Sequence, residues 1–283
     1  MNRAAQVDLT GRRVVVTGAT PGSLGFATAA ALVDWGADVV TTSRSGATGR
    51  ALDLTDAASV RAFADWYVNA HDRLDVLINN AGVHLDLRDT WKTPRSVDGH
   101  EIHWRTNYLG TMHLTDLLLP LLVRTGRQSG DARIVTVVSK LHARGRNEFL
   151  FDPVEPYHSW DAYGTSKLAL IHAMNELSRR HAADGVRGYS LHPGSVYSHI
   201  ADRGLEGHRI IGALRRIASP IERRMLLSPA DGAQTSLHCA SATGLPAGYY
   251  RDCRPAESSV QSQDVEAARR LWTETADWLT AQR

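Results

Sequence analysis

The stretch VVVTGATPGSLG, residues 14–25, decides the fold of this 283-residue chain. It begins with Val14–Thr17, a β-branched run typical of a strand. Small residues that include Gly18 and Gly22 follow, and an apolar helical pattern then covers Gly25–Trp35. A helix that begins just after a strand offers free backbone N–H groups and the positive end of its dipole, which suits a pyrophosphate. The order of strand, glycine turn and helix therefore favours nucleotide binding over a loop whose glycines serve only positive φ angles.

The same rhythm of apolar run, turn and amphipathic stretch continues along the chain. Further strands are expected at Asp38–Ser43, Val76–Ile78, Ile134–Val138 and Val186–Leu191. Continuous apolar strands that alternate with helices predict a parallel sheet buried on both faces. Right-handed crossovers then make it a doubly wound α/β fold of the Rossmann type, which we expect to form one domain over residues 1–283.

Three longer helices are expected from apolar residues at helical spacing. They cover Asp98–Val123, Asp161–His181 and Gln263–Ala281. Residues 195–228 break the rhythm, and we expect this insertion to cover the substrate. Its apolar residues alternate with arginines, which favours an apolar lid face with a solvated basic face over a basic lid that touches a membrane surface or an acidic substrate.

Composition limits the class of protein. Lys and Arg number 32 and Asp and Glu 30, so the net charge of +2 argues against a protein whose main work is to bind nucleic acid. Cys239 and Cys253 are too few for a thiolate-rich zinc site. His100–His103 lacks the histidine spacing of a helical zinc site, so we interpret it as helix surface and expect no metal. Neither a membrane-span pattern nor a signal-peptide pattern is visible, which predicts a cytoplasmic protein that does not associate with membranes.

The end of the second expected strand bears on the choice of nicotinamide cofactor. An acidic residue there binds the ribose hydroxyls of NAD, whereas an arginine can pair with the 2′-phosphate of NADP. Here the strand ends in Ser43 and Arg44, and Asp38 lies at its opposite end. NADP(H) is therefore favoured and NAD(H) stays open, the alternative being that Arg44 is only a solvated loop residue.

Tyr163 and Lys167 lie four residues apart at the start of an expected helix, so both can face one site. An ammonium near a phenol lowers the phenol pKa, which suits proton transfer at a carbonyl or alcohol oxygen. The alternative is a surface pair, the usual explanation of such a spacing. Ser139 at the end of the central strand and Asn107 in the long helix favour a catalytic set.

These motifs together resemble those of the short-chain dehydrogenase/reductase family. The resemblance covers Gly11–Trp278. It rests on the glycine turn, Asp53–Leu54, Asn79–Gly82, Asn107, Ser139, Tyr163 with Lys167, and Pro193–Gly194, in this order and with suitable gaps. A narrower likeness is to the branch that contains retinol dehydrogenases and the oxidoreductase domain of a WW-domain protein. It is carried by Asp98–Glu101, Thr106–Gly110, Ser228–Thr235, Tyr249–Cys253 and Leu271–Trp272.

The resemblance implies a sheet of about seven strands and a role for each motif. Tyr163 would be the general acid in reduction and the base in oxidation. Lys167 would lower the pKa of Tyr163 and hold the nicotinamide ribose, and Ser139 would hydrogen-bond the substrate oxygen. Asn107 would hold a water that connects Lys167 to solvent. The residues expected to bind the nucleotide are Gly18, Gly22, Ser23, Leu24, Gly25, Ser43, Arg44, Asp53, Leu54, Asn80, Ala81, Gly82, Tyr163, Lys167, Pro193, Gly194, Val196 and Ser198.

Two departures from the family pattern are visible. The glycine turn is one residue longer than usual, so either Gly22 serves as the middle glycine with an extra residue after it, or Ser23 takes that place. Residues 44–53 are too few for the usual helix between the second and third strands, which predicts a reduced sheet edge.

His84 and Trp91 follow the Asn-Asn-Ala-Gly motif and either border the substrate or serve packing.

The sequence thus predicts an oxidoreductase that uses NADP(H) to interconvert a carbonyl and an alcohol. Its small-molecule substrate would be a hydrophobic ketone, aldehyde or secondary alcohol. By family habit we expect a homodimer or homotetramer with contacts through the long helices. The alternative is a regulatory protein that senses NADP without turnover, although the complete set of Tyr163, Lys167, Ser139 and Asn107 argues against it.

Overall fold

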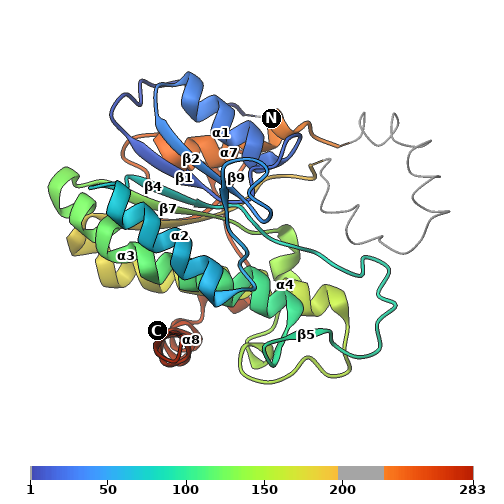
Figure 1. Ribbon diagram of the computed structural model, residues 1–283. Coiled ribbons are helices and arrows are strands. Elements are labelled where there is room, and N and C mark those ends of the chain that lie inside the picture. Colours follow the sequence, from blue (N-terminus) through green and yellow to red (C-terminus); the bar gives the residue numbers. More distant parts are fainter. Residues whose placement is uncertain (1, 197–225, 283) are drawn as a thin grey trace.

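Parallel strands with β-branched residues assemble the sheet at the centre of the protein. In a computed structural model that describes residues 2–196 and 226–282 (Figure 1), eight strands are hydrogen-bonded in the order β10-β9-β8-β7-β4-β1-β2-β3. Neighbouring strands are parallel except for the antiparallel pair of β9 and β10. The strands are β1 (Arg13–Val16), β2 (Asp38–Ser43), β3 (Arg50–Ala51), β4 (Val76–Asn79), β7 (Ala132–Val137), β8 (Val186–His192), β9 (Gly248–Arg251) and β10 (Arg254–Pro255). The expected doubly wound fold is confirmed, and the short edge strands extend the sheet beyond the expected size.

Two helical layers cover the sheet, as Figure 1 shows. One face carries α1 (Leu24–Asp34) and α7 (Pro229–Ser241), and the other carries α2 (Ala57–Ala70), α3 (Gly110–Ser129) and α4 (Ser159–His181). The last helix, α8 (Val265–Thr280), packs on α4 and α3 from outside. Short 3₁₀ helices cover Lys140–Arg144, Glu148–Leu150, Ala182–Asp184 and Val260–Gln263.

Alternation along the strands supplies both layers with apolar side chains. Val15 belongs to the hydrophobic cluster that α2, α3 and α4 complete, whereas Val14 and Val16 belong to the cluster beneath α1 and α7. All three valines are buried. A sheet that is apolar on both faces requires helices on both, which is the physical basis of the fold.

The helix expected at Asp98–Val123 begins later than the spacing predicts. A small hairpin of β5 (Ser96–Val97) and β6 (His100–Glu101) occupies its start. Asp98 and Gly99 make the turn of this hairpin with φ angles of 51° and 79°. Residues in the left-handed region cannot continue a right-handed helix, so the hairpin precedes it.

A π-helical turn, η1 (Trp104–Leu109), then leads into α3. The interpretation of His100–His103 as helix surface is therefore wrong. His100 lies in β6, and His103 is fully buried immediately before η1. Further along the chain, the helices expected at Asp161–His181 and Gln263–Ala281 are confirmed as α4 and α8.

The segment between β2 and β4 has the reduced edge that its length predicts. Only the two-residue β3 follows β2, and the next helix is α2. The loop before β3 is held by Thr48, whose N–H donates to Ser43 Oγ at 3.3 Å and whose hydroxyl donates to Ala19 O at 3.2 Å. The loop therefore stays close to the glycine turn.

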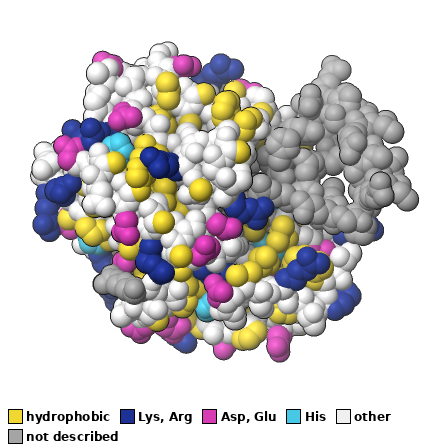
Figure 2. Space-filling model, viewed as in Figure 1, with side chains coloured by type: hydrophobic (Ala, Val, Ile, Leu, Met, Phe, Trp, Pro, Cys, Tyr) yellow, Lys and Arg dark blue, Asp and Glu magenta, His cyan; other side chains and the backbone are white. Residues whose placement is uncertain are grey.

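Most of the expected insertion, residues 197–225, lies outside the described residues. Its flanks meet, because Leu227 N donates to Ser195 O at 2.9 Å and Val196 pairs with Leu227 in an isolated bridge. Within the two described ranges, no helix combines the length and apolar character needed to cross a membrane. On the face shown in Figure 2, basic and acidic side chains are interspersed.

Candidate active site

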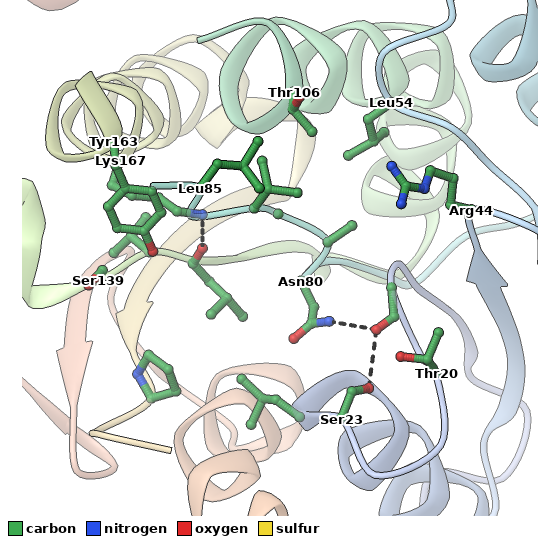
Figure 3. Close-up of a pocket in the computed structure, with 18 of the residues that line it drawn as sticks. Thr20, Ser23, Arg44, Leu54, Asn80, Leu85, Thr106, Ser139, Tyr163 and Lys167 are labelled. Atoms are coloured by element: carbon green, nitrogen blue, oxygen red, sulfur yellow. Dashed lines mark hydrogen bonds between the residues drawn. The ribbon is translucent and has the colours of Figure 1, made fainter. Parts of the chain in front are cut away.

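A cleft of about 460 Å³ opens along the carboxyl ends of the parallel strands. This edge is where open α/β sheets bind their ligands. Figure 3 shows Tyr163 and Ser139 at one end of the cleft and Arg44 at the other, with Ser23 and Asn80 between them. We call these ends the tyrosine end and the arginine end.

Most residues expected to form the site line this cleft. They are Gly18, Ser23, Leu24, Ser43, Arg44, Asp53, Leu54, Asn80, Ala81, Gly82, Ser139, Tyr163, Lys167, Pro193, Gly194 and Val196. Gly22, Gly25 and Asn107 do not line it, and Ser198 lies outside the described residues.

Other lining residues were not singled out by the sequence. They are Thr20, Leu52, Thr55, Val83, Leu85, Ile102, Thr106, Val137, Val138 and His192. Several adjoin expected residues, as His192 adjoins Pro193, so their place at the end of a strand was a usable signal. Ile102 offered no such signal, because it comes from the segment whose hairpin and π-helical turn were not expected, whereas Thr106 belongs to a motif of the narrower likeness.

The glycine turn brings backbone against backbone. Gly18 has a φ of +70°, and an added Cβ would lie 2.9 Å from the Cα of Ala81. Gly25 stands in the first turn of α1, where an added Cβ would collide with Asn80 and would lie 2.8 Å from Gly18 O. A side chain at either position would push the turn away from the loop after β4.

In the lengthened glycine turn, Ser23 caps the first helix. Its hydroxyl accepts a hydrogen bond from Phe26 N at 3.1 Å and donates to Gly18 O at 3.3 Å (Figure 3). Ser23 is thus the N-cap of α1, and Gly22, with a φ of +76°, completes the turn before it. Since Ser23 and Leu24 line the cleft, the N-terminus of α1 lies at its wall and fits an anionic group.

Asn80 fastens the loop after β4 to the end of β1. Its side-chain nitrogen donates to Thr17 O at 2.8 Å and to Gly18 O at 3.2 Å. In return, Thr17 Oγ1 accepts from the backbone N–H groups of Asn80 at 3.0 Å and Ala81 at 2.9 Å. These bonds keep the floor of the cleft in register with the glycine turn.

At the arginine end, Arg44 is exposed and lines the cleft directly after β2. The guanidinium of Arg50, the other nearby arginine, stacks on Trp66 at 3.6 Å from its ring centroid. Asp53 also lines the cleft, and its Oδ1 accepts hydrogen bonds from the backbone N–H of Thr55 at 2.9 Å and from the Thr55 hydroxyl at 2.7 Å. Arg44 is thus the described basic residue that can meet an anion at this end.

At the tyrosine end, α4 and β7 bring three polar groups together. Tyr163 and Lys167 lie one turn apart on α4, and Ser139 follows β7 (Figure 3). Figure 3 shows the Tyr163 hydroxyl and Ser139 at the same end of the cleft, and the Lys167 ammonium donates to Val137 O at 3.2 Å. The ammonium lies 5.7 Å from the centroid of the Tyr163 ring.

Burial shifts the pKa values of both groups at this end. Burial raises the pKa of Tyr163 to about 12, and the nearby hydroxyl of Ser139 offsets only part of that rise. Burial also lowers the pKa of Lys167 to about 8. Burial thus raises the phenol pKa in this structure, and the lowering by Lys167 that the family resemblance implies stays a prediction. Both shifts have one cause, because neither charged form is well solvated here.

Asn107 acts on the protein backbone in this structure. It lies fully buried in η1, and its Oδ1 accepts from Val83 N at 2.7 Å. Its Nδ2 donates to Val83 O at 2.9 Å and to Ser166 Oγ at 3.2 Å, which uses both amide hydrogens. The water-holding role that the resemblance implies for Asn107 stays a prediction.

His84 stacks on the phenol of Tyr163, with ring centroids 4.0 Å apart. Trp91, the other aromatic residue weighed in this loop, lies beneath the guanidinium of Arg95 at 4.2 Å. In this loop, His84 therefore packs on Tyr163, and Trp91 packs against Arg95.

Comparison with known proteins places this geometry in context. The sequence profile of a family described as short chain dehydrogenase matches residues 12–207. Retinol dehydrogenase 11 from Homo sapiens is 37% identical, over 96% of this chain and 87% of that protein. Dehydrogenase/reductase SDR family member 13 from Homo sapiens is 36% identical, over 94% of this chain and 72% of that protein. The crystal structure of an uncharacterized protein from Mycobacterium paratuberculosis superposes with a TM-score of 0.71 at 30% identity, covering 99% of this chain and 97% of that one.

Proposed function

We propose that this chain, which belongs to the short-chain dehydrogenase/reductase family, interconverts a hydrophobic carbonyl compound and its alcohol with NADP(H). The family makes it an oxidoreductase that acts on CH–OH groups with a nicotinamide cofactor. The choice of NADP(H) and the class of substrate are our inferences from the two ends of the cleft.

The observation that carries the proposal is the placement of Tyr163, Ser139 and Lys167 at one end of a cleft whose wall includes the N-terminus of α1. The glycine turn and the helix N-terminus fit a dinucleotide pyrophosphate, because side chains are absent where backbone must approach it. The bound nicotinamide would supply the hydride. The protein residues then have to hold the substrate oxygen and move one proton.

Tyr163 is suited to donate that proton. A phenol has an ordinary pKa of about 10, so Tyr163 is protonated at neutral pH, as a general acid must be. Ser139 can hydrogen-bond the same substrate oxygen. After the transfer, the ammonium of Lys167 favours the phenolate that remains, and in oxidation the phenolate accepts the proton.

Arg44 supports NADP(H). A 2′-phosphate at the arginine end would meet the guanidinium of Arg44, which lines the cleft there. Charge-assisted bonds between guanidinium and phosphate are among the stronger polar contacts in proteins. NAD(H) stays the alternative for this end of the cleft.

Apolar side chains support a hydrophobic substrate. Leu85 and Val138 line the cleft. Leu85 follows His84, which stacks on Tyr163, and Val138 precedes Ser139. The relatives named retinol dehydrogenases take, by their name, a long apolar alcohol. We therefore propose an aldehyde, ketone or secondary alcohol with a large apolar part.

Assembly and location stay predictions from the sequence, as a homodimer or homotetramer in the cytoplasm. The structure adds one constraint, because α8 packs on α4 and α3. The hydroxyl of Tyr108 shares a hydrogen bond of 2.7 Å with Thr275 of α8. A contact between copies through α3 and α4 would have to include α8 or use the sides it leaves free.

A carbonyl panel with cofactor titration tests the proposal. NADPH consumption followed by nicotinamide absorbance should show turnover with apolar aldehydes or ketones and tighter binding of NADPH than of NADH. Binding of NADPH with no consumption on any carbonyl compound would instead support a protein that senses the cofactor.

A further inference from the structure

The imidazole of His84 lies face to face with the phenol of Tyr163. The centroids are 4.0 Å apart and the planes differ by 10°. His84 is 5% exposed, and the edge of Trp160 meets it at a centroid distance of 4.7 Å. One face of the ring that carries the reacting hydroxyl is therefore covered by His84.

Hydrogen bonds fix the backbone on both sides of His84. Val83 exchanges two hydrogen bonds with the side chain of Asn107, at 2.7 and 2.9 Å. Leu85 N donates to His103 Nε2 at 2.9 Å. The residue that precedes η1, His103, and a residue in the middle of η1, Asn107, thus hold the residues after and before the stacked imidazole.

A buried network in turn fixes His103. Because Nε2 accepts the bond from Leu85, Nδ1 carries the proton and donates to Glu101 Oε1 at 2.7 Å. Glu101 Oε2 accepts from the N–H groups of His103 at 2.8 Å and Trp104 at 2.9 Å, and the Tyr157 hydroxyl donates to Oε1 at 3.1 Å. His103 is thus held in one tautomer and one orientation.

The contribution of His84 is its ring face. Its Nε2 is buried without a hydrogen-bond partner among the described residues. Burial lowers the pKa of His84 to about 3, with the ammonium of Lys167 acting in the same direction and Asp86 against it. The ring is therefore neutral, and it can stack on the phenol without adding a charge that would stabilise the phenolate.

We propose that His84 is a positioning residue for Tyr163, which by stacking fixes the plane of the phenol and directs its hydroxyl toward Ser139 and the substrate oxygen. The proposal rests on the proposed function, since it assigns the proton transfer to Tyr163. General acid catalysis contributes about 10²–10⁴-fold, and it depends on donor and acceptor being in reach when hydride moves. A phenol free to tilt loses part of that factor.

Two variants test whether Tyr163 needs a planar ring at position 84 or only a side chain that fills the space. His84→Leu fills the site without a planar ring, and we expect kcat to fall about tenfold or more at saturating NADPH with little change in the KM for NADPH. His84→Phe restores a planar apolar ring and should recover most of kcat. Trp91→Leu is the matched control, because Trp91 lies in the same loop and packs against Arg95. It should leave kcat unchanged.

A spectroscopic readout follows the stack without turnover. In protein with labelled tyrosine, the ring resonance of Tyr163 is identified by its loss in Tyr163→Phe. The ring current of the residue at position 84 should shift the Tyr163 resonance in the same direction in the wild type and in His84→Phe. In His84→Leu this ring-current shift should be lost.

The outcomes are distinguishable from failure of the proposed function. An active wild type whose His84→Leu variant keeps full kcat, or whose two variants lose kcat equally, overturns the positioning role alone. A wild type that reduces no carbonyl compound removes the proposed function, and this proposal falls with it.

Discussion

Lys167 on α4 donates a hydrogen bond of 3.2 Å to the carbonyl oxygen of Val137, the last residue of β7. The bond ties the helix that carries Tyr163 to the strand that leads to Ser139. It also brings a buried ammonium into the cleft, and burial lowers the pKa of Lys167 to about 8. Lys167 is therefore held where its charge is costly to the fold and useful to the proton transfer.

Lys167 should make stability depend on pH in a defined window. Its pKa falls from 10.5 to about 8 on folding, so between these values Lys167 adds a positive contribution to the slope of the free energy of unfolding against pH, opposite in sign to that of buried thiols such as Cys239, whose pKa burial raises. Lys167→Met should remove this contribution. At neutral pH it should also raise the free energy of unfolding by up to about 3 kcal/mol, less the lost hydrogen bond. Urea denaturation at neutral pH and within the window measures both.

Lys140→Met is the control for that experiment, because Lys140 is an exposed lysine. It should keep the slope of the wild type. Parallel pH dependences of stability in the wild type and Lys167→Met would show that Lys167 is solvated in the folded protein.

Arg44→Ala should weaken NADPH binding by about 10- to 100-fold, the range of a lost charge-assisted contact, and leave NADH binding nearly unchanged. The physical reason is that only NADPH carries the 2′-phosphate. Arg50→Ala serves as control, since Arg50 stacks on Trp66. Fluorescence titration of both nucleotides decides, and equal losses for NADPH and NADH would argue against the phosphate assignment.

Arg105 should be a major contributor to stability. The fully buried guanidinium donates to Leu54 O at 2.7 Å and to Thr55 O at 2.8 Å, and it lies 5.4 Å from the ring centroid of Trp278 on α8. Arg105→Met leaves these two carbonyl oxygens without a buried donor, and the free energy of unfolding should fall by about 2–5 kcal/mol.

Exposed Arg95 provides the comparison for that variant. Arg95→Met should change the free energy of unfolding by about 0.5 kcal/mol or less. Chemical denaturation that gives the same value for both arginine variants would contradict the bridging role of Arg105.

Local pattern was enough to predict the sheet and most of the cleft. β1, β2, β4, β7 and β8 lie where the apolar runs placed them, because strands buried on both faces need continuous apolar sequence. Tyr163 and Lys167 share a face because helical geometry requires it. The likeness to retinol dehydrogenases is confirmed by relatives at 35–37% identity.

Features that depend on packing between distant segments could not be predicted. The Asp98–Gly99 turn lies inside a stretch with a helical pattern, and only the paired strands β5 and β6 reveal it. The direction of the Tyr163 pKa shift follows from burial, which a sequence does not state. The stack of His84 on Tyr163 likewise needs the clamp from His103 and Asn107.

The measurement that bears most directly on the central claim is the turnover of Tyr163→Phe with a carbonyl compound that the wild type reduces. The substitution removes the hydroxyl and keeps the ring on His84, so the protein should fold and NADPH should still bind. We expect kcat to fall about 10²–10⁴-fold, the contribution of general acid catalysis. A Tyr163→Phe protein that binds NADPH normally and retains full kcat would show that the proton comes from elsewhere.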